Sequence, residues 1–483
     1  MSRILVGPFN RVEGDLEISL DIEEGQVNSA RVNSPLFRGF ERILQGQQPM
    51  DALVYTPRIC GICSVSQSVA CANALADLMD LDVPENGELA TNLVLANENM
   101  TDLLTHFYLF FMPDFAREIY AGQPWFSEVE SRYKAQKGSA SQRMLPARSD
   151  FLHLMGIMAG KWPHTLSLQP GGSSKPVEPQ ERIRLLAVIG SFRRYLEQHL
   201  FGDDLEAITE LQSVDELQDW ADKADWASSD FRTFLHLSDK LQLSELGQGT
   251  GQFLSYGNYP VKGQRFIRSG TYLDGKINPV DSSQITEDLA YAWMQGGDQP
   301  LHPSSGITEP SLDNSEAYSW CKAPRLQQQV VEVGALSRQL INGHPLITDL
   351  VRQQGATVES RIIARLVELA LVIPQMQHWA KALNPNEPFC HQGKLPKEGS
   401  GVGMVEAARG SLGHWLRVEK GRISNYQIIA PTTWNFSPRD QQSVPGVLEQ
   451  ALVGTPVQPG EKEPVAVQHI VRSFDPCMVC TVH

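Results

Sequence analysis

Two Cys-x-x-Cys pairs near opposite ends of the chain constrain its fold more than any other feature. The first pair is Cys60 and Cys63, and the second is Cys477 and Cys480. A pair with this spacing, in a turn that leads into a helix, places both sulfurs on one side, close enough to chelate one ion. Thiolate ligands select zinc, nickel, copper(I) or iron over magnesium and calcium. If both pairs hold the same centre, the chain must fold so that its two ends meet.

A zinc site is the first alternative, because bare Cys-x-x-Cys pairs are most often zinc ligands. The two pairs lie 477 − 60 = 417 positions apart, whereas zinc ribbons are usually local. A chain of 483 residues also does not need a metal in order to fold. A thioredoxin-like dithiol is a second alternative, but no small βαβ pattern surrounds either pair. These arguments favour a shared redox-active centre over both alternatives.

Three further cysteines are scattered along the chain: Cys71, Cys321 and Cys390. Cys71 falls on a predicted helix, where the usual role of a cysteine is that of a small buried hydrophobic residue. Cys390 and His391 could form a ligand pair, but no partner motif accompanies them. Three scattered cysteines cannot bind an iron–sulfur cluster of the usual four-cysteine kind. If the centre exchanges electrons, another subunit must therefore carry them.

The composition narrows the class of protein. The formal net charge is −15, and no dense Lys/Arg cluster occurs, which argues against nucleic acid or an anionic membrane as the main partner. Seven cysteines in a chain of this length argue against a disulfide framework. The chain contains no run of about 18 uncharged apolar residues, so no transmembrane helix is predicted. The segment before Pro8 is too short for a secretory signal. We therefore expect a cytoplasmic location.

The hydrophobic pattern predicts strands at the two ends and helices between them. Alternation over residues 16–22 predicts a strand, and residues 27–32 could return as the second strand of a hairpin. Apolar residues at helical spacing predict long helices, at residues 64–79, 89–112, 182–200 and 360–383. We expect a single domain over residues 1–483 that comprises a β-rich region at 1–50, a mainly helical body at 51–400 and a C-terminal metal-site region at 401–483.

An ordered set of motifs identifies a family. They are Arg11-Val-Glu-Gly14, Phe37-Arg-Gly-Phe-Glu41, Arg58-Ile-Cys-Gly-Ile-Cys63, Gly160-Lys-Trp-Pro-His164, Lys322-Ala-Pro-Arg325, Glu406-Ala-Ala-Arg-Gly410, Ala430-Pro-Thr-Thr-Trp-Asn435 and Asp475-Pro-Cys-Met-Val-Cys-Thr-Val-His483. The set resembles the large subunit of nickel–iron hydrogenases over essentially the whole chain. The resemblance implies a predominantly α, α+β fold in which an N-terminal β-hairpin region covers a long-helix bundle, with the metal deep where the chain ends meet.

The resemblance implies a nickel–iron centre on the four cysteines. Nickel would be bound by Cys60, Cys63, Cys477 and Cys480, and Cys63 and Cys480 would bridge to an iron that carries CO and cyanide ligands. An electrophilic metal polarises H2 so that a nearby base can take a proton. Cys477 is the expected base, and Glu13 the next proton acceptor, since a carboxyl in a dry site can have a raised pKa. The plainer alternative for Glu13 is a salt bridge with its neighbour in the motif, Arg11.

The resemblance also assigns residues around this centre. Arg409 would lie above the metal pair, held by Asp102 and Asp475, because an Arg–carboxylate fork has fixed geometry. A turn or capping role is the alternative for Asp475. Thr432 would bond a cyanide ligand, with a plain turn hydroxyl as its alternative.

A second metal site is implied by residues near both ends of the chain. Glu41, His483 and the carbonyl of Ile428 would bind a buried magnesium ion or a second iron. Carboxylate and carbonyl oxygens suit magnesium, whereas a histidine ligand is less usual for it. Taken alone, Glu41 would more often be a surface charge.

The sequence departs from the family pattern at several positions. Gln67 stands where the family has histidine, Asp15 replaces a second histidine, and Ala408 replaces a proline before Arg409. The sequence ends at His483, so a cleaved C-terminal extension either never existed or was removed. Gln67, Asp15 and this ending resemble the hydrogen-sensing, or regulatory, branch. Glutamine cannot take up a proton, but it can hydrogen-bond a bridging sulfur.

Three functions remain open from the sequence. The first is a low-turnover hydrogenase that senses H2 and signals to a histidine kinase, and the second is an uptake hydrogenase that feeds a respiratory chain. The third is a non-catalytic homologue, like the related subunits of NADH-oxidising complexes, but those lack the four cysteines. The expected partners are an iron–sulfur small subunit and maturation proteins.

Overall fold

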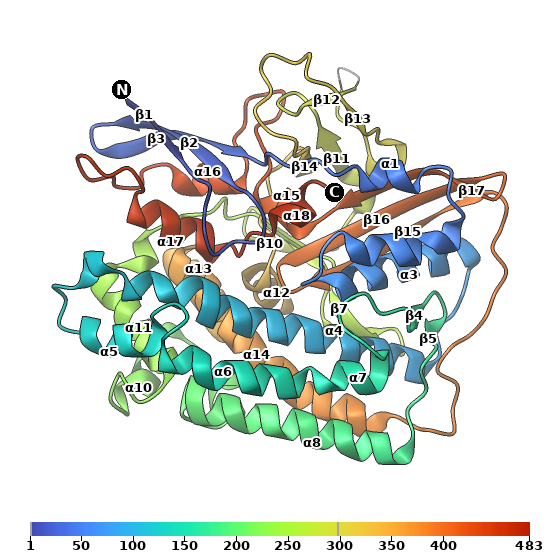
Figure 1. The fold of residues 1–483 in the computed structure, drawn as a ribbon, viewed down its shortest axis with the longest axis horizontal. Helices are drawn as coiled ribbons and strands as arrows, with labels where there is room; N and C mark the ends of the chain where they lie inside the picture. The colour runs from blue at the N-terminus through green and yellow to red at the C-terminus, as the bar shows by residue number, and fades with distance from the viewer. Residues whose placement is uncertain (1, 297–298) are drawn as a thin grey trace.

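A bundle of long helices forms the lower half of the molecule in the computed structural model (Figure 1), which describes residues 2–296 and 299–483. At its centre, α14 (Val358–Ala382) packs against α4 (Glu85–Thr105) and α8 (Pro179–Tyr195), and α6 (Ser139–Phe151) packs on α8. Most residues of α14 are buried, as expected for a helix surrounded by other elements. The fold class expected from the sequence is confirmed.

The other helices surround this bundle or connect it to the sheets. They are α1 (Phe40–Leu44), α2 (Ala52–Tyr55), α3 (Ser64–Met79), α5 (Phe126–Tyr133), α7 (His153–Ala159), α9 (Leu205–Thr209), α10 (Val214–Asp222), α11 (Asp230–Leu241), α12 (Ala335–Asn342), α13 (Pro345–Gln354), α15 (Pro431–Asn435), α16 (Val447–Leu452), α17 (Val465–Ser473) and α18 (Met478–Thr481). No helix in the described part of the chain is long and apolar enough to cross a membrane.

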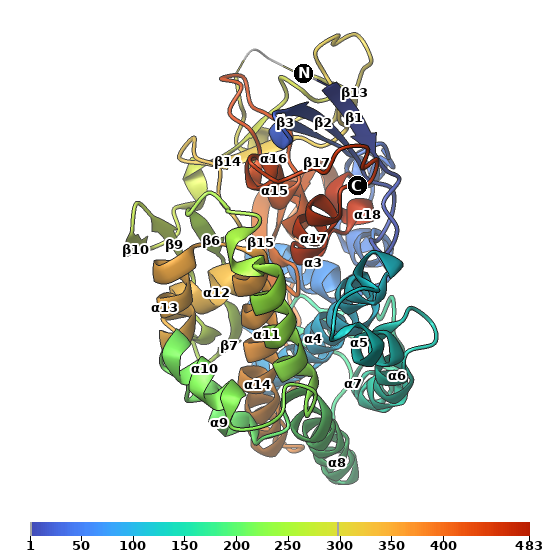
Figure 2. The ribbon, with the colours of Figure 1, turned by 90° about the vertical axis from the view of Figure 1, so that its left-hand side faces the viewer.

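The N-terminal strands form an antiparallel sheet in the order β1 (Ser2–Val6), β2 (Glu17–Glu23), β3 (Gln26–Asn33). The predicted hairpin is thus present, with a third strand added at its edge. This sheet is tied to the C-terminal part of the chain: Val27 N–H donates to the Thr455 carbonyl (2.9 Å), and Gly454 N–H donates to the Val27 carbonyl (2.8 Å). The C terminus lies beside α18 in Figures 1 and 2, and Glu13, near the other end of the chain, forms an isolated β-bridge with Cys477. The two ends of the chain therefore meet.

A second three-stranded sheet supports α3, the helix that follows the first cysteine pair. It consists of β15 (Gly399–Ala407), β16 (Gly410–Glu419) and β17 (Arg422–Ile429), and α3 packs on β15 and β16. The approach is close because β15 carries glycines: a Cβ added at Gly403 would lie 1.9 Å from the Ala70 carbonyl oxygen, and one at Gly401 would lie 2.0 Å from that of Ala74. The glycines therefore set the position of α3.

Short strands of two to four residues lie between the helices, in residues 168–173 and 253–326. They are β4 (Leu168–Gln169), β5 (Gly172–Ser173), β6 (Phe253–Ser255), β7 (Asn258–Val261), β8 (Gln264–Ile267), β9 (Gly270–Leu273), β10 (Lys276–Asn278), β11 (Ile285–Asp288), β12 (Met294–Gln295), β13 (Glu309–Pro310) and β14 (Ala323–Leu326). The body at residues 51–400 is therefore less purely helical than its periodicity predicts. The division of the chain into three regions of one domain stays a prediction.

Candidate metal centre

The four cysteines of the two Cys-x-x-Cys pairs converge in space. Sγ atoms of Cys60 and Cys477 lie 3.5 Å apart, those of Cys63 and Cys480 lie 3.1 Å apart, and those of Cys477 and Cys480 also lie 3.1 Å apart. All four are buried, and their sulfurs lie within 4.8 Å of one another. No other group of three or more histidine, cysteine or acidic side chains in residues 2–296 and 299–483 brings its possible ligand atoms together in this way.

Such a group of soft ligands in a dry site fits a thiophilic metal ion. The pKa of Cys60 lies well below the usual range, because hydrogen bonds with the other thiols, that of Cys477 first, stabilise its thiolate. Hydrogen bonds with the neighbouring thiols, that of Cys477 first, raise the pKa of Cys63 and of Cys480, and burial raises it further. A thiolate that its neighbours already stabilise is prepared for metal binding, since the ligand form of cysteine is the thiolate.

Local contacts hold the first cysteine pair at the start of α3. The Glu98 carboxylate accepts hydrogen bonds from Val65 N–H (2.8 Å) and Ser66 N–H (2.9 Å), the free donors of the first turn of this helix. The first N–H groups of a helix have no partner within the helix, and this carboxyl supplies one for two of them. The same carboxylate accepts from the indole of Trp162 (2.9 Å), which gives the Gly160–His164 motif a structural role.

One arginine connects the two cysteine pairs. The Arg38 guanidinium donates to the carbonyl of Ile59, directly before Cys60, and to that of Val479, directly before Cys480. From the sequence alone, no role is predicted for Arg38 or for Glu98. Both act on main-chain groups far away in the sequence, so only their place in a motif or on a helix could have indicated them.

Glu13 lies beside the second cysteine pair through its main chain. Its N–H donates to the Pro476 carbonyl (3.3 Å), and its carbonyl accepts from Met478 N–H (2.7 Å). Burial raises the pKa of the Glu13 carboxyl, and the charge of Cys60 raises it further. Arg11 pairs with Asp114 instead of Glu13, so the plainer alternative for Glu13 has no support.

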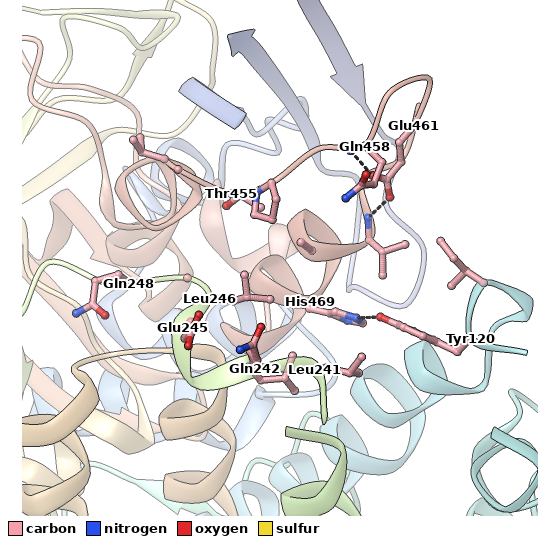
Figure 3. A pocket seen from close by; sticks show the side chains of 18 residues that line it. Tyr120, Leu241, Gln242, Glu245, Leu246, Gln248, Thr455, Gln458, Glu461 and His469 are labelled. Carbon is pink, nitrogen blue, oxygen red and sulfur yellow. Dashed lines mark hydrogen bonds between the residues drawn. The ribbon is translucent and has the colours of Figure 1, made fainter. Parts of the chain in front are cut away.

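Asp114 continues this contact network to a surface cavity. The carboxylate of Asp114 also binds the guanidinium of Arg472 (2.8 Å) and faces the imidazole of His469 (3.3 Å). His469 bonds the hydroxyl of Tyr120 (2.7 Å) in the wall of a cavity of about 620 Å³ (Figure 3). None of the four cysteines lines this cavity, which therefore lies apart from the metal centre.

Arg409 is held by the two carboxyls expected from the sequence. One guanidinium nitrogen (Nη1) donates to Asp102, Nη2 donates to the Asp475 carboxylate (3.0 Å), and Nε donates to the Asp475 main-chain carbonyl (2.9 Å). Burial raises the pKa of Asp102 to about 8, against the opposing effect of Arg409. Burial acts in the same direction on Asp475, but Arg409 and His106 outweigh it and lower its pKa. The guanidinium is thus fixed in one orientation near the sulfurs.

Thr432 and Gln67 also lie at the positions expected near the cysteines. The Thr432 hydroxyl oxygen accepts from Cys477 N–H (3.1 Å). Gln67 follows Cys63 by one helical turn, and its side-chain oxygen lies 2.8 Å from Nε2 of His414. Burial lowers the pKa of His414 to about 3, so this imidazole is neutral. The amide nitrogen of Gln67 is buried without a hydrogen-bond partner among the described residues, so its bond to a sulfur stays a prediction.

Glu41 and His483 lie together in a second buried site. Their closest atoms, Oε1 of Glu41 and Nε2 of His483, are 3.4 Å apart. Ile428 contacts Glu41 through its N–H (2.8 Å), not through the carbonyl that the sequence analysis expected as a ligand. These residues line a cavity of about 20 Å³ together with Lys322 and Glu287. The predicted residues are therefore close together, and the sequence analysis missed the last two.

The charges around this small cavity are unequal. Lys322 donates to Glu41 (3.1 Å) and to the side chain of Gln427 (2.6 Å). Glu287 is buried, Nζ of the same lysine lies 3.5 Å from one of its carboxyl oxygens, and burial raises its pKa. Two buried carboxyls beside one lysine can accommodate a cation, since buried charges require compensation.

The comparisons with known proteins place the chain in a family. The family described as "Nickel-dependent hydrogenase" matches residues 38–123 and 142–483. The chain belongs to the nickel-dependent hydrogenase family. It is the catalytic large subunit of a nickel–iron hydrogenase, and its four buried cysteines fit the nickel that the family requires.

Relatives and solved structures match this hydrogenase along its whole length. It is 27% identical to the periplasmic [NiFeSe] hydrogenase large subunit of Desulfomicrobium baculatum and 27% identical to the uptake hydrogenase large subunit of Rhodobacter capsulatus, in each case over 100% of this chain and 95% of the relative. A structure of the H2-activated Dm. baculatum [NiFeSe]-hydrogenase matches with a TM-score of 0.86 and 26% identity, and covers 100% of both chains.

Proposed function

We propose that this hydrogenase subunit is a hydrogen sensor, which cleaves H2 slowly into protons and electrons and signals to a histidine kinase. The observation that carries the proposal is Gln67, in the turn of α3 that follows Cys63. A glutamine cannot accept a proton, so the proton-accepting group that the family has at this position is missing. A low turnover suits a sensor, because its product is a signal.

A nickel–iron pair with CO and cyanide ligands, held by the four cysteines, would supply the electrophile that polarises H2 and the acceptor for its electrons. We propose that the sulfur of Cys477 takes the first proton and that the Glu13 carboxyl takes it next. The main-chain pairing of Glu13 with Pro476 and Met478 supports this order, because it keeps the residue beside the second cysteine pair, and its carboxyl is near enough to Cys60 for the charge of that cysteine to raise the carboxyl's pKa. Its raised pKa lets the carboxyl carry a proton between transfers.

Arg409 would stabilise the charge that develops as H2 is polarised. Its three hydrogen bonds to Asp102 and Asp475 fix the guanidinium before the reaction, and a preorganised charge needs no reorientation in the transition state. The Thr432 hydroxyl accepts one hydrogen bond from Cys477 N–H, so its own hydrogen remains available to bond a cyanide nitrogen.

We also propose that the second buried site holds Mg²⁺ or a second iron, with Glu41, His483 and the main chain of Ile428 around it. Two buried carboxyls, those of Glu41 and Glu287, share the single ammonium group of Lys322 there, which supports a cation in this cavity. The ion would join the C-terminal residue of this chain to α1 near the other end, and so stabilise the segment that carries Cys477 and Cys480.

Several partners belong to the proposal. An iron–sulfur small subunit would conduct the electrons, because the chain's remaining cysteines are scattered. A histidine kinase would receive the signal through that subunit, maturation proteins would install the metals, and the complex would be cytoplasmic. An uptake role is the second candidate, supported by the relatives that carry this name.

The test compares turnover with signalling in the purified complex. H2 oxidation with a dye as electron acceptor is expected to be slow, and autophosphorylation of the proposed partner histidine kinase is expected to respond to H2. Fast, sustained H2 oxidation with a kinase that ignores H2 would support the uptake role and exclude the sensor.

A further inference from the structure

Gln67 lies on the face of α3 that carries Cys63. The two residues are one helical turn apart, and Gln67 N–H donates to the Cys63 carbonyl (3.1 Å). Helical side chains lean toward the N-terminal end of the helix, so the Gln67 side chain extends toward the turn of Cys63. It is 1% exposed. Its amide is therefore a buried polar group next to the metal centre.

Side chains of two neighbouring strands lie behind the oxygen of this amide, one contacting the oxygen and the other contacting the first side chain. Nε2 of His414, on β16, lies 2.8 Å from the Gln67 side-chain oxygen, and Nδ1 of the same ring lies 2.8 Å from the Tyr426 hydroxyl, on β17. Both rings are completely buried and meet edge to face at 5.5 Å. A neutral imidazole has one N–H donor and one acceptor nitrogen. If the hydroxyl donates to Nδ1, the Nε2–H remains to donate to Gln67.

The side-chain nitrogen of Gln67 is buried and has no hydrogen-bond partner among the residues that the structure describes. A buried donor without a hydrogen bond costs about 1–3 kcal/mol, and such groups are rare in folded proteins. When Nε2 of His414 carries the proton, it donates to the amide oxygen, and turning the amide over would lose this bond. The NH2 group then has a fixed orientation.

We propose that His414 and Tyr426 are positioning residues that orient Gln67, so that its NH2 group donates a hydrogen bond to the sulfur of Cys63 in the metal-loaded enzyme. The inference rests on the proposed nickel–iron centre with CO and cyanide ligands. A hydrogen bond to a thiolate ligand withdraws electron density from its metal. The stretching bands of CO and cyanide report that density directly.

The test is infrared spectroscopy of the complete, metal-loaded enzyme with Tyr426→Phe. Removing one hydroxyl frees the ring of His414 to change its tautomer, and we expect the CO and cyanide bands to shift to lower wavenumber. Gln67→Ala should shift them in the same direction, and Tyr426→Phe should add no further shift in the Gln67→Ala background. Tyr259→Phe is the matched control: it removes an equally buried hydroxyl, bonded to Asn99 (3.1 Å), and should leave the bands unchanged.

A second pair of variants covers a failure of Tyr426→Phe to fold. His414→Leu should shift the bands, and His414→Gln, which keeps a donor, should restore them toward the parent position. Bands that stay unchanged in Tyr426→Phe and His414→Leu would overturn this inference and leave the metal centre intact. A parent enzyme without CO and cyanide bands would overturn the proposed centre itself, and this inference with it.

Discussion

Arg409 is held from two directions by groups that come from distant parts of the chain. Its fork reaches Asp102 on α4 and both the carboxylate and the carbonyl of Asp475. A lysine keeps the charge but has no planar fork, so it cannot hold that charge in the same fixed orientation. The orientation of the charge, rather than its presence, is therefore the property that a conservative substitution tests.

Arg409→Lys is expected to lower the rate of H2 oxidation by about 100-fold or more, the usual effect of losing a preorganised donor, while nickel and iron contents stay at the parent level. Dye-coupled H2 oxidation and metal analysis measure the two. Arg417→Lys, on the exposed part of β16 beside Glu419 (2.7 Å), is the control. Parental activity in the Arg409→Lys enzyme would show that the guanidinium geometry is not needed for H2 oxidation.

Because Glu98 is buried, its protonation makes the free energy of unfolding depend on pH. Burial raises its pKa from 4.5 to about 7, although hydrogen bonds from α3 oppose this. Between these values the folded protein holds a proton that the unfolded chain has lost. The stabilisation from this group is therefore fully present below about pH 4.5 and decreases as the pH rises to about 7. The decrease is on the order of 3 kcal/mol.

Glu98→Gln removes this titration. The difference in melting temperature between parent and Glu98→Gln should therefore change between about pH 4.5 and 7 and stay constant above that range. Thermal unfolding across the pH range measures it. Two curves that run parallel from pH 4.5 to 8 would show that Glu98 does not titrate in this window.

At the scale of elements, the packing of α3 on β15 positions the first cysteine pair. Gly403→Ala would place a methyl group 1.9 Å from the Ala70 carbonyl oxygen, so the helix and the strand must separate. Overpacking of this kind costs about 1–3 kcal/mol. We expect a lower melting temperature and a lower nickel content. Gly156→Ala on α7, where the added carbon meets nothing within 4 Å, should lower neither, since alanine favours a helix over glycine; equal behaviour of the two variants would contradict the packing argument.

The sequence predicts the long elements better than the short ones. The helix predicted at 64–79 coincides with α3, and α8 and α14 lie within a few residues of their predictions, because long amphipathic or buried helices leave a clear period. The helix predicted at 89–112 corresponds to α4 and the π-helical segment His106–Phe111 that continues it. The strands from β6 to β14 were not predicted, since pieces of two to four residues are too short for alternation to be recognised. The motifs predicted which residues surround the cysteines. They did not predict Arg38, Glu98 or His414, whose partners are distant in the sequence.

At the scale of the whole molecule, Arg38 joins the two ends of the chain by binding the carbonyls before Cys60 and Cys480. Arg38→Ala leaves both carbonyls without this partner, and each charged hydrogen bond contributes about 1.5–3 kcal/mol. We expect faster loss of nickel to a chelator, measured by metal analysis over time. Arg42→Ala removes a nearby exposed arginine, 3.7 Å from Glu309, and should have little effect. Equal nickel loss in both variants would exclude this role for Arg38.

The convergence of the two chain ends on one nickel site is the claim on which the other arguments depend. Nickel K-edge X-ray absorption of the purified complex tests it most directly. The account predicts nickel surrounded by four sulfur atoms, with fewer sulfur neighbours or no nickel in Cys477→Ser. A chain that contains only zinc at its cysteines, or nickel bound by nitrogen and oxygen alone, would contradict it.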